Sequence, residues 1–188
     1  MTQPRIAPGT LREVSPLAWL IAHAGGLQAR TGPLTLFLTL GRHRKLFGRW
    51  LRFAGRLMPG GRLPRIDTEL VILRVAGLRG CDYEYGHHVR IGRRAGLTAA
   101  DIDRVGRADH GATAEGWTAR QRAILAAVDE LHHDGDLSDP TWTALREQLD
   151  EVGCIELCML VGHYEMLATT ITALRIQPDP PRRRIRRA

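Results

Sequence analysis

The chain has 188 residues, of which 44% are hydrophobic and 25% are charged, as expected for a water-soluble protein with a hydrophobic core. Its three cysteines form neither a Cys-x-x-Cys pair nor a disulfide framework, and the N-terminus lacks a signal-peptide core, which predicts a cytoplasmic protein without a membrane span. The net charge of +7 is concentrated in a C-terminal run of five arginines over 182–187, and the body resembles no nucleic-acid-binding fold, so the sequence argues against a nucleic-acid partner.

The distribution of proline, glycine and apolar residues predicts an all-α protein. Residues 1–15 are rich in proline and glycine and are expected to form an irregular arm. No segment shows the alternation of a strand, and apolar residues recur at helical spacing from residue 16 onward. The expected helices cover 16–27, 34–40, 44–58, 67–76, 81–95, 98–105, 118–133, 138–148 and 151–174. We therefore expect one helical domain over 16–175 and a disordered Arg-rich tail over 176–188.

Local capping signals fix several of these helix ends. Asp67 is expected to be an N-cap, and Gly96 suits the position just after a helix C-terminus. Thr118 and Gln121 have the spacing of a capping box, in which each side chain satisfies a backbone amide of the first turn.

The most informative stretch is Cys81-Asp-Tyr-Glu84-Tyr-Gly-His-His88, preceded in the chain by Glu69. On a helix, Cys81, Glu84 and His88 share one face, so a thiol, a carboxylate and an imidazole point the same way. These groups carry out acid–base and nucleophilic chemistry near neutral pH. The stretch therefore predicts a candidate catalytic site.

Each of these four residues has an expected role. Glu84 can orient His88 and raise its pKa, and Glu69 can assist as a base if its helix packs against this one. Cys81 begins the helix, where the positive end of the dipole lowers a thiol pKa. Structural roles stay open at this point: a buried Cys81, a helix-stabilising Glu84–His88 pair, and a first-turn Glu69 that favours the helix dipole.

Further polar residues accompany the motif. Tyr83, Tyr85 and His87 interleave with it, and His163 interrupts the last apolar helix, so these four are candidates for binding substrate. The chain has no His-x-x-x-His or paired Cys-x-x-Cys spacing, no phosphate loop and no dinucleotide fingerprint. We therefore expect neither a metal nor a cofactor.

The sequence around the motif resembles the carboxymuconolactone decarboxylase family, which includes alkylhydroperoxidase D-like proteins. The resemblance rests on Glu-Leu-Val-Ile-Leu-Arg at 69–74, the motif at 81–88, Arg-Ala-Gly-Leu-Thr at 94–98 and Val-Gly-His-Tyr-Glu-Met-Leu-Ala at 161–168. It implies an alkylhydroperoxidase D-like helical bundle that assembles into trimers or hexamers.

The resemblance also implies roles for individual residues. Glu69, Cys81 and His88 match the relay Glu, the first Cys and the distal His of the peroxidase branch, whereas Glu84 stands where its second Cys would be. Glu84 and His88 match the Glu-x-x-x-His of the decarboxylase branch. Because a single Cys cannot close an intramolecular disulfide, this departure argues against a dithiol peroxidase.

Three functions follow as hypotheses. The leading one is a cofactor-independent decarboxylase, isomerase or lyase that acts by acid–base chemistry on a small organic acid, lactone or enolisable carbonyl compound. The second is a one-cysteine peroxidase or redox sensor, in which Cys81 forms a sulfenic acid. The third is a non-catalytic protein of the same fold that binds a small ligand.

Overall fold

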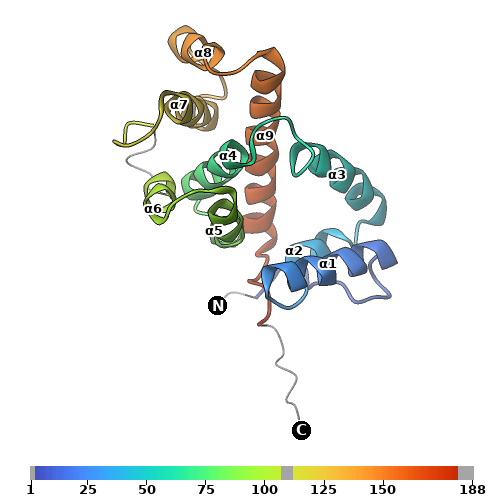
Figure 1. Cartoon of the computed structure of the whole chain (residues 1–188). Helices are drawn as coiled ribbons and strands as arrows, with labels where there is room; N and C mark the ends of the chain where they lie inside the picture. The colour runs from blue at the N-terminus through green and yellow to red at the C-terminus, as the bar shows by residue number, and fades with distance from the viewer. Residues whose placement is uncertain (1–2, 107–111, 182–188) are drawn as a thin grey trace. The chain divides into compact units, whose positions relative to one another are not determined.

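In the computed structural model, which describes residues 3–106 and 112–181, the secondary structure of these residues is helical. The helices are α1 (Pro16–Ala29), α2 (Thr35–Leu40), α3 (Arg44–Leu57), α4 (Arg65–Leu78), α5 (Asp82–Ala95), α6 (Ala99–Gly106), α7 (Ala119–His133), α8 (Asp139–Arg146) and α9 (Glu151–Leu174) (Figure 1). The all-α prediction is confirmed, and the only β-type pairing in the described residues is an isolated bridge between Thr31 and Pro181.

The chain divides into two compact units, one formed by residues 54–169 and the other by residues 1–53 with 170–188. In the second of these, residues 3–15 contain no helix, and α1, α2 and α3 surround an aromatic core. Phe37, Phe47 and Trp50 meet there with ring centroids 5.6–5.9 Å apart. The domain boundaries expected from the sequence stay predictions, and the arginines at 182–187 lie outside the described residues.

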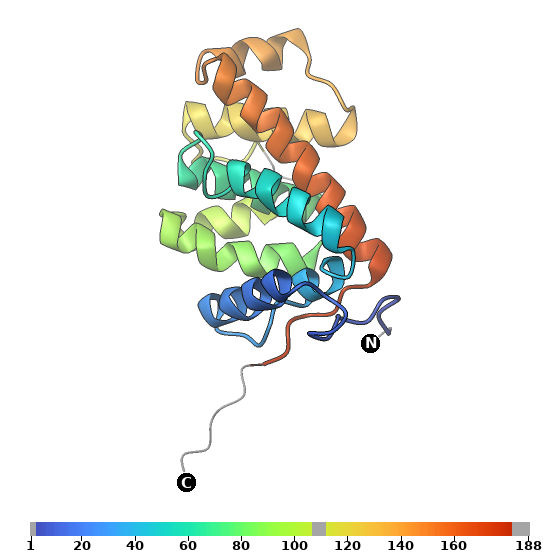
Figure 2. The ribbon, with the colours of Figure 1, turned by 90° about the vertical axis from the view of Figure 1, so that its right-hand side faces the viewer.

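Helix α4 is the central element of the 54–169 unit. Every residue from Asp67 to Ala76 is buried, and α4 contacts α5, α6 and α7 (Figures 1 and 2). A helix that is buried on all sides carries apolar residues around its whole circumference. Its leucines join one hydrophobic cluster with residues from the surrounding elements: Leu70, Leu73, Leu97, Ile102, Val105, Trp117 and Leu125. Polar groups on α4 are therefore enclosed and need partners.

Asp67 illustrates this need and corrects a prediction. The helix begins at Arg65, two residues before the expected N-cap, and Pro64 occupies the cap position. Asp67 lies inside the first turn, where its Oδ2 accepts a hydrogen bond from Nε of Arg120 at 2.8 Å. The carboxylate thus joins α4 to α7 and does not cap α4, because a partner remote in sequence was available.

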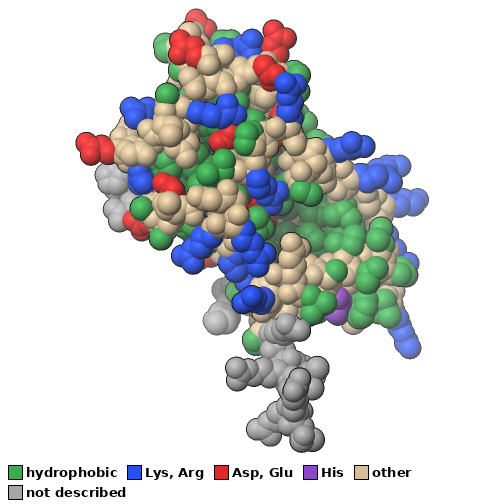
Figure 3. Space-filling model, in the orientation of Figure 1, with side chains coloured by type: hydrophobic (Ala, Val, Ile, Leu, Met, Phe, Trp, Pro, Cys, Tyr) green, Lys and Arg blue, Asp and Glu red, His purple; other side chains and the backbone are tan. Residues whose placement is uncertain are grey.

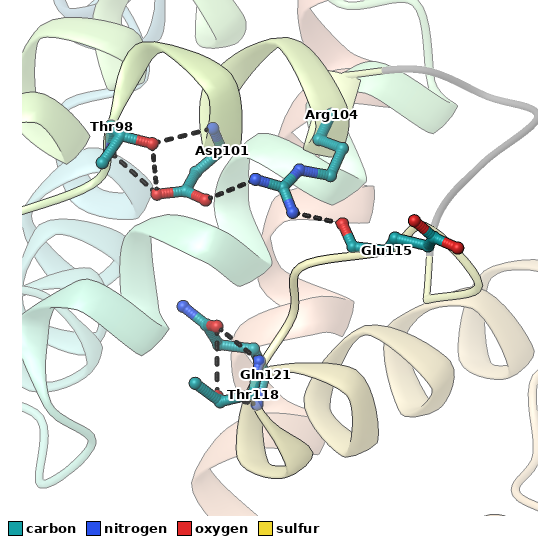
Figure 4. A network of polar contacts seen from close by, with 6 residues as sticks. All are labelled: Thr98, Asp101, Arg104, Glu115, Thr118 and Gln121. Atoms are coloured by element: carbon teal, nitrogen blue, oxygen red, sulfur yellow. Dashed lines mark hydrogen bonds and ion pairs between the residues drawn. The ribbon is translucent and has the colours of Figure 1, made fainter.

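The segment from α6 to α7 is held by short-range polar contacts (Figure 4). Thr98 and Asp101 exchange hydrogen bonds at the start of α6, and Arg104 bonds both Asp101 and the carbonyl of Glu115. The predicted capping box of Thr118 and Gln121 is present at the start of α7. Part of the polar connection expected between the two helices, residues 107–111, lies outside the described residues.

On the face shown in Figure 3, Lys and Arg side chains occur in several separate places.

Within the described residues, α9 is long and apolar enough to cross a membrane by length and composition alone. The core helix of a water-soluble protein passes the same test, and Leu157, Leu160 and Val161 of α9 are buried. The length of α9 is therefore weak evidence for a membrane span.

Candidate active site

The candidate site forms where α4 and α5 pack together. Glu69 of α4 is fully buried, and its Oε2 lies 2.7 Å from Nδ1 of His88 on α5. Gly92, one turn beyond His88, lets the helices approach, because a methyl group on it would lie 3.0 Å from Leu97 and 3.3 Å from Leu73. The structure therefore brings together two residues that the sequence placed on separate helices.

Glu84 contacts the other nitrogen of the same imidazole. Oε2 of Glu84 lies 3.4 Å from Nε2 of His88, and His88 is one helical turn further along α5. Burial by itself would lower the pKa of His88, but hydrogen bonds and negative charge from Glu69 and Glu84 outweigh it and raise the pKa to about 9. This is the direction that the sequence predicted for the effect of Glu84, and it favours the imidazolium form at neutral pH.

Arg65 completes the cluster and was not predicted from the sequence. Its Nη2 lies 2.8 Å from Oε1 of Glu69, so the Glu69 carboxylate bridges Arg65 and His88 with one oxygen on each. The spacing of Arg65 and Glu69, one helical turn apart, was the signal available in the sequence. It was not distinctive, because such pairs are common on solvated helix faces.

Cys81 occupies the N-cap position of α5, and its side chain makes no capping hydrogen bond. The residue is only 3% exposed. Burial raises the pKa of the thiol, with a further increase from the charge of Glu84, and these effects exceed the lowering by the backbone amides of Glu84 and Tyr83. A net lowering of this pKa by the helix N-terminus is therefore not found, because burial and the neighbouring carboxylate outweigh the backbone amides.

Helix α9 contributes His163 and Tyr164. The Tyr164 ring packs edge-on against His88 with centroids 5.4 Å apart, and its hydroxyl donates to Sδ of Met58 at 3.5 Å. His163 is buried beside Tyr164; burial lowers its pKa, and the charge of Glu84 opposes this effect only in part. His163 was expected at the site, whereas Tyr164 was missed although it is the next residue in the same polar interruption of α9.

The remaining candidates lie on other faces of α5. Tyr83 and His87 are half-buried and pair with each other, with ring centroids 4.9 Å apart. Tyr85 points to α6, where its hydroxyl donates to the carbonyl of Ile102 at 2.6 Å. The Tyr85 hydroxyl is therefore part of the α5–α6 contact and is not placed with the Glu69–His88 pair.

Within residues 3–106 and 112–181, no group of three or more His, Cys, Asp and Glu side chains is arranged to hold a metal ion. The chemistry that the cluster offers is that of a protonated imidazole between two carboxylates, with a neutral thiol, a phenol and a guanidinium close by. Such a set transfers protons.

Comparison with solved structures identifies the class of fold. An alkylhydroperoxidase AhpD core protein from Ralstonia eutropha JMP134, described as an uncharacterized peroxidase-related protein, has a TM-score of 0.79 at 18% identity and covers 95% of this chain and 94% of its own. A peroxidase-related protein from Silicibacter sp. TM1040 has a TM-score of 0.77 at 16% identity, with 95% of each chain covered. The debrominase Bmp8 has a TM-score of 0.74 at 15% identity and covers 93% of this chain and 91% of its own. The protein therefore has the alkylhydroperoxidase D-like fold.

The sequence itself matches a family model over part of the chain. Residues 44–130 match the carboxymuconolactone decarboxylase family model, and the segment contains Arg65, Glu69, Cys81, Glu84 and His88. No curated protein sequence matches the chain significantly. The resemblance to this family that the motifs predicted is therefore confirmed over residues 44–130.

Proposed function

We propose that this protein is a cofactor-independent proton-transfer enzyme that acts on a small organic acid, lactone or enolisable carbonyl compound. The observation that carries the proposal is the buried His88 imidazole between Glu69 and Glu84, with a pKa raised to about 9. A histidine in this environment holds a proton at neutral pH and acts as a general acid. Decarboxylation and isomerisation both need such a proton donor.

The two nitrogens of His88 have different roles in this proposal. The 2.7 Å contact of Nδ1 with Glu69 fixes the orientation of the ring. The 3.4 Å contact of Nε2 with Glu84 is longer than an ordinary N–H···O hydrogen bond. The proton on Nε2 is thus held less tightly, and it is the one that His88 gives to the substrate.

The proposed proton transfer completes either a decarboxylation or an isomerisation. In decarboxylation, carbon dioxide leaves, the electron pair of the broken C–C bond stays on carbon, and that carbon takes the proton from Nε2 of His88. In isomerisation, Glu84 removes a proton from one carbon and His88 delivers a proton to another. In both forms, Cys81 serves as a polar neighbour of Glu84 and stays a thiol.

The state of Cys81 favours this proposal over peroxide reduction. The thiolate is the form that attacks a peroxide, and burial raises the pKa of this thiol. The peroxidase-related structures are below 20% identical to this chain, so they support the fold and leave the reaction open. Assembly into trimers or hexamers and a cytoplasmic location stay predictions.

Solvent deuterium exchange tests the proposal without knowledge of the natural substrate. The protein would be incubated in deuterium oxide with levulinate, 2-oxobutyrate or γ-butyrolactone, and exchange at the carbon next to the carbonyl would be followed by proton NMR. We expect catalysed exchange that falls by roughly 100-fold or more in His88→Gln. His133→Gln is the matched control, because His133 is exposed and its Nδ1 bonds only the carbonyl of Asp129 in its own helix.

Two outcomes would contradict the proposal. Exchange that persists in a folded His88→Gln protein would remove His88 from the reaction. Binding of these compounds without exchange by the wild-type protein would indicate a ligand-binding protein of the same fold. Circular dichroism and size-exclusion chromatography of each variant establish that it is folded.

A further inference from the structure

The chain distributes its charge unevenly, and its N-terminal part is strongly basic. No acidic residue occurs between Glu13 and Asp67, whereas the same stretch contains nine basic residues. In the compact unit that contains α1 and α2, the acids are Glu13 and Asp179, and Glu13 is paired with Arg42 at 2.9 Å. This unit therefore carries an excess of positive charge that its own acids do not neutralise.

Helix α3 presents both basic and apolar side chains to solvent. Lys45, Arg49 and Arg52 are exposed and follow one another at intervals of one helical turn. Leu46 is 58% exposed and Phe53 is 39% exposed, and these two residues lie two turns apart beside the basic side chains. A basic helix that carries Leu or Phe beside its charges is typical of segments that bind at the surface of a membrane.

Helix α1 adds exposed apolar side chains in the same unit. It contains no Asp, Glu, Lys or Arg, and Leu17, Leu20 and Leu27 share one of its faces with exposures of 55%, 60% and 60%. Ala18 of α1 and Phe47 of α3 are buried in one core, so the two helices are neighbours. Figure 3 shows hydrophobic side chains gathered over this part of the molecule, with Lys and Arg side chains at its outer edge. We call these exposed side chains of α1 and α3 the α1–α3 surface.

The combination of charge and apolar side chains indicates the kind of partner. Exposed apolar patches of this kind mark sites that bind another protein or a membrane. A nucleic acid would pair with the cations and leave the leucines and Phe53 in water. A second copy that docked through the same surface would bring like charges together, which is destabilising. An anionic lipid surface suits both kinds of side chain, because its phosphates pair with cations and its acyl chains accept apolar groups.

We propose that the α1–α3 surface binds a membrane that contains anionic phospholipid, with α3 lying in the plane of the headgroups. Binding of this kind requires no membrane-spanning helix. The inference goes beyond the reaction proposed for His88 and does not depend on it, because vesicle binding is measured without a substrate.

Vesicle flotation tests the inference with the full chain. The protein would be mixed with vesicles of phosphatidylcholine alone, or of phosphatidylcholine and phosphatidylglycerol in equal amounts, at low and at high salt. One variant combines Lys45→Gln, Arg49→Gln and Arg52→Gln and removes the charge of α3. The other combines Leu46→Ser and Phe53→Ser and removes its exposed apolar side chains.

Two control variants carry the same kinds of substitution elsewhere. Arg90→Gln, Arg93→Gln and Arg94→Gln together remove three exposed cations from α5. Ile155→Ser and Met159→Ser together remove apolar side chains of α9 that are 65% and 48% exposed. Each variant and its control thus lose the same amount of charge or a similar amount of apolar surface, and only the location differs. Far-UV circular dichroism establishes that every protein is folded.

We expect the wild type to float with the anionic vesicles, to remain unbound with phosphatidylcholine alone, and to be released by high salt. The triple substitution on α3 should weaken binding by roughly 100-fold, because each cation near an anionic surface contributes separately. The double substitution on α3 should weaken binding by about tenfold or more. Both controls should bind like the wild type.

Several outcomes would overturn the inference. One is a wild type that does not float, or that floats equally well with both kinds of vesicle. Another is an α3 variant that binds as tightly as its control. A change in the sedimentation coefficient of the Leu46→Ser and Phe53→Ser variant without a change in flotation would instead assign this surface to a contact between copies. Binding of a DNA duplex without vesicle binding, lost only in the triple variant, would assign it to nucleic acid.

Discussion

The environment of His88 predicts a pH dependence of stability. Burial opposes its charge, but Glu69 and Glu84 raise its pKa from 6.5 to about 9 on folding. Because the folded protein holds this proton more tightly than the unfolded chain, the stabilisation is fully present below pH 6.5 and is lost as the pH rises through about 9. At about 1.4 kcal/mol for each unit of pKa, it amounts to roughly 3 kcal/mol.

Urea unfolding followed by far-UV circular dichroism measures this contribution. The free energy of unfolding would be determined for the wild type and for His88→Gln at intervals from about pH 6 to about pH 9, and the difference between the two proteins would be plotted. Groups remote from His88 titrate alike in both proteins, so the difference reports His88 together with the carboxylates of Glu69 and Glu84 that contact it. We expect it to fall by about 3 kcal/mol over this range. A difference that does not change with pH would refute the conclusion that the two carboxylates hold an imidazolium.

Three further predictions follow from the same contacts. In Glu69→Gln the loss of the negative charge beside Nδ1 should lower the pKa of His88 by about one unit or more, measured by carbon-13 NMR of labelled histidine, and an unchanged titration would contradict the assigned contact. In Glu84→Gln the pKa values of the His88 imidazole and the Cys81 thiol should both fall, and iodoacetamide labelling against pH reports the thiol; a rise in either value would contradict the assigned charge effects. Wild-type Cys81 should react slowly with peroxide at neutral pH in an intact-mass assay, and rapid sulfenylation that disappears in Cys81→Ser would instead support the redox hypothesis.

The helices were predictable because their signals are local. The capping box at Thr118 and Gln121 and the left-handed cap at Gly96 are determined by neighbours in sequence, and both are present. Asp67 was misassigned because the partner of its carboxylate, Arg120, lies on another helix. Local rules describe a cap correctly only where no remote group competes for it.

The candidate site was predictable only in part, for a related reason. Helical spacing predicts that Glu84 and His88 meet, because one turn separates them on a single helix. Spacing does not predict that Glu69 contacts Nδ1 of His88, because this contact depends on the packing of α4 against α5 at Gly92. Nor can it show that Tyr164 packs on His88 from α9, since that contact joins segments far apart in the chain.

Residue 84 influences both the imidazole and the thiol of the site. The carboxylate of Glu84 contributes to the raised pKa of His88 and also, through its charge, to the raised pKa of Cys81. Both raised pKa values favour the protonated side chains. The imidazole stays an acid, and the thiol stays protonated and poorly nucleophilic. A neutral side chain at this position would remove both effects together, which favours thiolate chemistry at Cys81 and weakens acid catalysis at His88. Under the proposed function, glutamate at residue 84 therefore favours proton transfer over thiolate chemistry.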